Sequence, residues 1–161
     1  MRNVAQTKRL IEAMRTLSTQ QIMLHQAVAD KMNLNLTDYK CMDFIAHFGP
    51  MTAGKLATLS GLTTGATTGA IDRLERAGYA QRVDNPKDRR SVIIKLTWDN
   101  AKRRHYEEIF LPLEQEMKKM IATYTDKELT SFTEIIYKEA KLLHEETTRL
   151  NRNNTKITKP A

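Results

Sequence analysis

The residues best suited to bind a polyanion stand together in one short polar segment. Lys87, Arg89 and Arg90 lie within four positions of one another, with Asp88 among them. Lysine and arginine bind phosphate through charge-assisted hydrogen bonds, and arginine also enters narrow DNA grooves. Turn-forming residues precede this segment, and residues 92–96 after it alternate like a strand. With residues 79–83 as the partner strand, the sequence predicts a β-hairpin with a cationic tip.

Basic residues concentrate around this hairpin. The chain of 161 residues has a formal net charge of +7 and a pI near 9.6. Residues 82–104 contain eight Lys and Arg against three acidic residues, whereas residues 105–150 contain six against ten. Such clustering is typical of a nucleic-acid binder, and a solvated basic surface is the alternative interpretation.

The segment before the hairpin has the composition of a helix-turn-helix. A short helix over residues 52–59, capped by Thr52, is followed by a turn and by a second helix that begins at Thr63 or Thr64. The second helix opens with threonines and two glycines, all of which lower helix propensity. Small hydroxyl residues and glycine suit a helix that approaches bases and phosphates closely. The alternative is a loop before a helix that starts near Ala66.

Longer helices with one apolar face are expected on both sides of this region. Apolar residues recur every three or four positions in residues 3–33, 105–124 and 129–150. Thr97 is expected to cap the helix after the hairpin, and Thr125 is expected to open the last helix with a capping box. These stripes are too long to be covered by a core of this size, so we expect a homodimer.

The numbers and positions of cysteine and histidine residues limit which disulfides, metal sites and catalytic sites the chain can form. The single cysteine, Cys41, excludes an intrachain disulfide and suits a reducing cytoplasm. It lies on the apolar side of a helix that Thr37 is expected to cap, so we expect an inert thiol. The four histidines are widely spaced and form no metal-binding pattern. No motif indicates catalytic residues or a cofactor, so the sequence does not indicate an enzyme. No apolar run approaches a membrane span.

Residues about 36–97 resemble the winged helix-turn-helix of the MarR family of bacterial transcription regulators. The order of long helices extends the similarity to about residues 3–150. The motifs that carry it are Leu36-Thr37, Leu56-Ala57, the run Ile71-Asp72-Arg73-Leu74-Glu75-Arg76-Ala77-Gly78-Tyr79, Arg82, Asp88-Arg89-Arg90 and Leu96-Thr97.

The resemblance implies a mainly α fold with a small β-hairpin wing. Its expected parts are an N-terminal dimerisation helix (1–35), a winged helix-turn-helix DNA-binding domain (36–97), C-terminal dimerisation helices (98–150) and a polar tail (151–161). It also implies a cytoplasmic homodimer that represses transcription from a pseudo-palindromic operator in double-stranded DNA. The alternative is a winged helix that serves as a protein-interaction module and binds no operator.

The resemblance further assigns roles to residues. Arg90 reaches into the minor groove and Asp88 orients it through an ion pair, while Lys87 and Arg89 contact phosphates. Arg73 binds phosphate or braces the wing; for Arg73 and Arg76 the alternative is ion pairing with Asp72 and Glu75. The residues expected to face the major groove are Thr63, Thr64, Thr67 and Thr68.

A small aromatic or anionic effector is also implied by the resemblance. It would occupy a cleft between the helix-turn-helix and the dimer helices. Ordinary core packing is the alternative for every residue of this set. The expected lining residues are Met14, Arg15, His25, His47, Phe48 and Met51.

Overall fold

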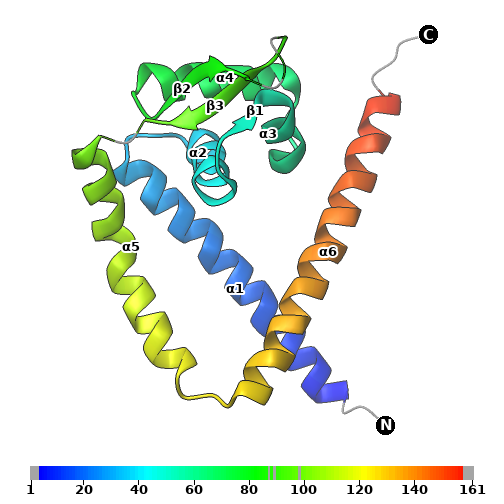
Figure 1. The fold of residues 1–161 in the computed structure, drawn as a ribbon. Coiled ribbons are helices and arrows are strands. Elements are labelled where there is room, and N and C mark those ends of the chain that lie inside the picture. The colour runs from blue at the N-terminus through cyan, green and yellow to red at the C-terminus, as the bar shows by residue number, and fades with distance from the viewer. Residues whose placement is uncertain (1–3, 87, 89, 98, 158–161) are drawn as a thin grey trace. The chain divides into compact units, whose positions relative to one another are not determined.

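The structure, a computed structural model, describes residues 4–157 apart from Lys87, Arg89 and Trp98, without the side chains at 100–101 and 152–157. The chain divides into two compact units, Met1–Asp99 and Asn100–Ala161 (Figure 1). The fold is mainly helical with a small antiparallel sheet, as the sequence predicted. Within the described residues, every helix is too short or too polar to cross a membrane.

The first unit holds the helix-turn-helix and the sheet. Its elements in chain order are α1 (Val4–Lys31), α2 (Leu36–Phe48), β1 (Met51–Thr52), α3 (Ala53–Ser60), α4 (Thr64–Arg76), β2 (Ala80–Asp84) and β3 (Val92–Leu96). The strand order is β1-β3-β2, and both pairs are antiparallel. The predicted hairpin of β2 and β3 is confirmed. β1 adds a third strand, which has only two residues and so shows no periodicity in the sequence.

The core of the first unit lies where α2, α3, α4 and the sheet meet. Ile94, on the central strand, pairs with Met51 on one side and Arg82 on the other. Its side chain is buried together with Leu56 of α3 and Leu74 of α4. Burying apolar side chains of this size contributes about 1.5–3 kcal/mol each. α4 also contacts β2 directly, so it is held against the sheet that carries the wing.

Helix ends agree with the sequence at some positions and differ at others. Thr52 and Thr63 cap α3 and α4 as expected, and Gly78 has the left-handed φ of 70° expected after α4. Asn35, not Thr37, caps α2, because its side-chain oxygen accepts the Asp38 N–H. The expectation that Thr97 caps the next helix is wrong, because its hydroxyl donates to the Gly78 carbonyl and the helix begins at residue 100.

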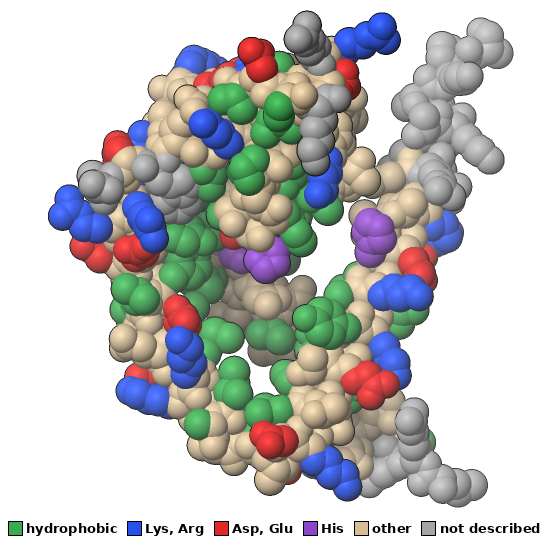
Figure 2. Space-filling model, viewed as in Figure 1, with side chains coloured by type: hydrophobic (Ala, Val, Ile, Leu, Met, Phe, Trp, Pro, Cys, Tyr) green, Lys and Arg blue, Asp and Glu red, His purple; other side chains and the backbone are tan. Residues whose placement is uncertain are grey.

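The second unit consists of two long helices, α5 (Asn100–Ile121) and α6 (Asp126–Ile157). The capping box between them is confirmed: Thr125 N–H donates to the Glu128 carboxylate, and Glu128 N–H donates back to the Thr125 hydroxyl. Hydrophobic side chains stand at the surface along both helices (Figure 2). They are Leu111, Leu113, Met117, Met120 and Ile121 on α5, and Phe132, Ile135, Tyr137, Leu142, Leu143 and Leu150 on α6.

Candidate nucleic-acid interface

The threonine- and glycine-rich segment forms the first two turns of α4. The helix begins at Thr64, and the Thr63 hydroxyl accepts the Ala66 N–H at 3.2 Å. The alternative of a loop before Ala66 is therefore wrong. Thr64, Gly65 and Thr68 are exposed. The start of α4 thus presents an outer surface of small side chains and accessible backbone.

Thr67 does not belong to this outer surface, contrary to the expectation that it faces a groove. Its side chain is only 1% exposed, and its hydroxyl donates to the Thr63 carbonyl at 3.0 Å. With Ala70, Ile71 and Leu74 it forms the i, i+3, i+4, i+7 set that packs into the core. Thr67 is therefore a core residue that cannot reach a base edge.

The wing tip is a pair of consecutive turns between β2 and β3. Asp88 N–H donates to the Asn85 carbonyl at 3.2 Å, and Ser91 N–H donates to the Asp88 carbonyl at 3.0 Å. The Asn85 side-chain amide closes the loop by donating to the Ser91 hydroxyl at 2.8 Å. Lys87 and Arg89, two of the expected phosphate contacts, lie outside the described residues.

Asp88 acts on the backbone of the wing tip. Its carboxylate accepts the backbone N–H of Arg90 at 3.0 Å, which is the Asx-turn geometry. Among the described side chains, no ion pair joins it to the Arg90 guanidinium, so the expected pair is not formed. Arg90 is exposed. Asp88 therefore shapes the loop from which Arg90 projects, and within the described residues it accepts only the backbone N–H of Arg90 and not its guanidinium.

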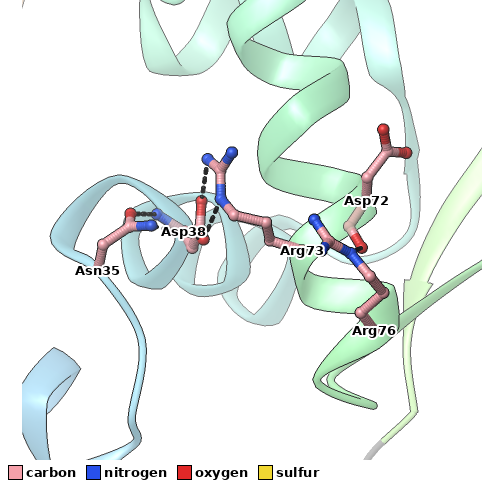
Figure 3. A network of polar contacts seen from close by, with 5 residues as sticks. All are labelled: Asn35, Asp38, Asp72, Arg73 and Arg76. Carbon is pink, nitrogen blue, oxygen red and sulfur yellow. Dashed lines mark hydrogen bonds and ion pairs between the residues drawn. The ribbon is translucent and has the colours of Figure 1, made fainter.

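Arg73 makes a different ion pair from those expected (Figure 3). Its Nε and Nη2 donate to the two oxygens of Asp38, both at 2.8 Å, across 35 positions of sequence. This hydrogen bonding raises the pKa of the Arg73 guanidinium above its ordinary value. Arg76 Nε donates to the Asp72 carbonyl at 3.3 Å. Neither arginine uses the carboxylates of Asp72 or Glu75.

Those two acids hold Arg82 of β2 instead. Arg82 Nη2 donates to Asp72 at 2.7 Å, and its Nη1 donates to Glu75. The backbone N–H of Arg82 also donates to Glu75, at 2.7 Å. Three hydrogen bonds therefore tie the first strand of the wing to α4. In the sequence, Arg82 stood only among the motifs of the family resemblance, and this tie to α4 was not predicted.

The expected effector residues are spread over the first unit. His25 packs against Tyr39 with ring centroids 5.7 Å apart, and burial with the nearby charge of Lys40 lowers the pKa of His25. His47 packs edge-on against Phe48 at 4.6 Å, and both are exposed, whereas Met51 is buried. Met14 and Arg15 lie about 15 Å or more before His25 along α1. The set therefore forms two aromatic contacts, and residues outside the set lie between them: Lys40 stands over the Tyr39 and Phe44 rings, and Phe44 stacks on Phe48.

Cys41 is buried in α2, as expected. Burial, followed by the negative charge of Asp38, raises the pKa of its thiol to about 11. Within the described residues, no group of three or more His, Cys, Asp or Glu side chains is placed to hold a metal ion.

Comparison with known proteins identifies the family to which this chain belongs. A family model described as "MarR family" matches residues 34–92. The uncharacterized HTH-type transcriptional regulator YcgE of Bacillus subtilis is 39% identical over 144 residues, which cover 89% of this chain and 92% of that protein. The chain belongs to the MarR family. It is a DNA-binding transcriptional regulator and not an enzyme.

Solved structures show the same fold at lower sequence identity. FabT of Streptococcus pneumoniae in complex with DNA is 18% identical, has a TM-score of 0.67, and covers 86% of this chain and 98% of its own. A MarR mutant of E. coli complexed with operator DNA is 20% identical, has a TM-score of 0.55, and covers 81% of this chain and 92% of its own. This MarR-family protein therefore has the winged-helix fold that those two proteins have in their DNA complexes.

Proposed function

We propose that this protein is a homodimeric repressor that binds a pseudo-palindromic operator in bacterial cytoplasm and is released by a small aromatic or anionic effector. The observation that carries the proposal is the start of α4. Its outer surface is made of exposed Thr64, Gly65 and Thr68, and a wing with exposed Arg90 follows directly. A surface of small groups lets a helix lie deep in the major groove while a wing reaches the flanking minor groove.

Individual residues take distinct roles in this proposal. Thr64 and Thr68 stand four positions apart on one side of α4 and contact base edges. Thr63 lies at the helix N-terminus, where unpaired backbone N–H groups favour a phosphate. Arg90 reads the narrow minor groove of A·T-rich flanks. Lys87 and Arg89 keep their sequence-based role as phosphate contacts.

Dimerisation is supported by apolar side chains that a single copy leaves at the surface. The predicted stripe along α1 and the turn that follows it is buried only at its end, at Val28 and Met32, while Leu10 and Leu17 stay 40% and 46% exposed. The exposed apolar residues of α5 and α6 extend the same argument to the second unit. Sedimentation at low micromolar concentration should give a species of twice 18.5 kDa. A monomer that binds one palindrome as a single copy would refute the dimer.

Operator binding is tested by selecting duplexes from a random pool and measuring their affinity over a salt series. We expect two half-sites whose centres lie about 34 Å apart, one helical turn. Arg90→Ala should weaken binding and remove the preference for A·T flanks. A protein-interaction module would instead show little salt-dependent affinity for any duplex.

Effector release is supported by the contact between His25 and Tyr39, because Lys40 places a positive charge 6.0 Å from the centroid of the Tyr39 ring. The test adds a panel of aromatic carboxylates to the operator complex and follows dissociation. Release by one of them, weakened in His25→Ala, would support the proposal. The sign of regulation is tested by deleting the gene and measuring transcripts from the operator-bearing promoter, which should rise.

A further inference from the structure

The ion pair between Asp38 and Arg73 is asymmetric in its burial. The Asp38 side chain is 3% exposed and the Arg73 side chain 44%. Both Asp38 oxygens accept from Arg73, and one of them also accepts the Asn35 side-chain amide at 2.7 Å. The buried acid is therefore fully engaged from two directions, while the arginine reaches the surface of α4.

The pairing leaves one edge of the guanidinium unused. An arginine carries five N–H groups, and Asp38 takes the one on Nε and one on Nη2. Of the other three, one on Nη2 and one on Nη1 form the outer edge of the guanidinium and the second on Nη1 points back toward Cδ, and among the described residues these three have no partner. A carboxylate thus holds the inner edge of the fork while the outer edge keeps the geometry that suits a phosphate.

The position of Nη1 relates this outer edge to the outer surface of α4. A Cβ added at Gly69 would lie 3.3 Å from Arg73 Nη1, so the guanidinium rests over a position without a side chain. Gly69 is four positions after Gly65 and one after Thr68, which are both exposed. The unused N–H groups therefore lie beside the part of α4 that is proposed to enter the groove.

We propose that Asp38 is a positioning residue for the DNA-phosphate contact that the family resemblance assigns to Arg73. The inference rests on the proposed function, because it requires α4 to lie in the major groove. A free arginine loses much rotamer freedom when it binds, and an arginine already held by Asp38 has lost most of it beforehand. Asp38 therefore strengthens DNA binding even though its own charge repels phosphate.

The opposition between charge and positioning makes Asp38→Asn a sharp test. The change keeps the size of the side chain, removes one negative charge per subunit, and turns one acceptor of Arg73 into a donor. Charge alone predicts tighter binding to every duplex. Positioning predicts operator affinity about fivefold weaker or more for the dimer, from rotamer freedom that must now be lost on binding. The slope of log affinity against log salt should not fall, because Arg73 keeps its charge.

Arg73→Ala should instead lower that slope by about one per subunit, since a phosphate contact is lost, and should weaken operator and random duplexes alike. Arg73→Lys keeps the charge without the fork, so we expect weaker binding with the slope retained. Arg76→Ala is the matched control, because it removes the same charge from the same helix at a residue that, in the described part of the chain, no carboxylate holds. Equal losses of affinity and slope in Arg73→Ala and Arg76→Ala would overturn the proposal.

Gly69→Ala separates positioning from folding. Alanine raises helix propensity, so the melting temperature should rise. The new Cβ crowds Nη1, so operator affinity should nevertheless fall by several-fold. Unchanged affinity in this variant would contradict the proposed path of the arginine.

All affinities are measured well below the melting temperature of each variant. If Asp38→Asn melts lower but binds the operator as tightly as the wild type, Asp38 is only a structural tie between α2 and α4. If the wild-type protein binds no duplex at all, operator binding itself fails and this inference fails with it.

Discussion

Replacing Asp88 tests how the wing presents Arg90. The Asp88 carboxylate accepts the Arg90 backbone N–H in a loop that is otherwise held by Asn85 and Ser91. Asp88→Ala removes this acceptor and also removes a negative charge close to DNA. Asp88→Asn removes the same charge but keeps a side-chain oxygen that can accept the N–H. The two variants therefore separate loop shape from electrostatics.

The hydrogen bond that shapes the loop is expected to affect operator affinity more than the charge of Asp88 does. A hydrogen bond in an exposed turn contributes about 0.5 kcal/mol, the low end of the usual range, and thus about 1 kcal/mol for two wings. One charge and a phosphate roughly 10 Å apart in water interact by about 0.4 kcal/mol, and physiological salt reduces this to less than half. The hydrogen-bond loss exceeds the electrostatic gain, so Asp88→Ala should weaken operator binding about threefold. Asp88→Asn should stay within about twofold of the wild type.

The assay is fluorescence anisotropy on the selected operator and on a random duplex of equal length. Asp88→Ala should lose affinity for the operator and gain slightly for the random duplex, where the wing needs no fixed direction. If Asp88→Ala and Asp88→Asn both tighten binding to every duplex equally, the carboxylate does not shape the wing tip. If both weaken operator binding equally, the charge itself orients Arg90, as an ion pair would.

Three further outcomes follow from the described contacts. Cys41 should resist thiol reagents in the folded protein and react once the protein is unfolded, and Cys41→Ser should leave operator affinity unchanged. Because burial raises the pKa of the Cys41 thiol from 9.0 to about 11, the free energy of unfolding should fall as pH rises across that interval. The serine variant should lack this dependence on pH. Thr67→Val should leave operator selection unchanged while Thr68→Val alters it, and the reverse pattern in selected sequences would contradict the burial of Thr67. Arg82→Met should lower the melting temperature and weaken the preference for A·T flanks together, and a loss of stability with flank preference intact would show that Arg82 has no part in placing the wing.

Much of the fold could be predicted from local signals in the sequence. The hairpin, the caps at Thr52 and Thr63, the capping box at Thr125 and the left-handed Gly78 all depend on residues within a few positions of one another. Local sequence patterns do not identify a helix cap when two nearby residues suit that position equally well. Asn35 and Thr37 both suit a helix cap, and only the chain path after α1 places Asn35 at the helix start.

The candidate site was harder to predict because its partners are distant in sequence. Asp38 and Arg73 are 35 positions apart, so no spacing pattern could pair them. Thr67 is a different case, because Ala70, Ile71 and Leu74 already mark the core face of α4 and Thr67 falls on it. The threonine-rich composition concealed this periodicity, since a residue with a methyl group and a hydroxyl suits either a core or a groove.

The three hydrogen bonds from Arg82 to α4 have a consequence for the spacing of DNA contacts. A wing joined to α4 at its first strand cannot slide along the duplex independently of the helix. The base pairs read in the major groove and the flank read by Arg90 should then be separated by a constant number of base pairs. Operators in which an A·T tract is shifted by two base pairs relative to its half-site should be bound no better than operators without the tract.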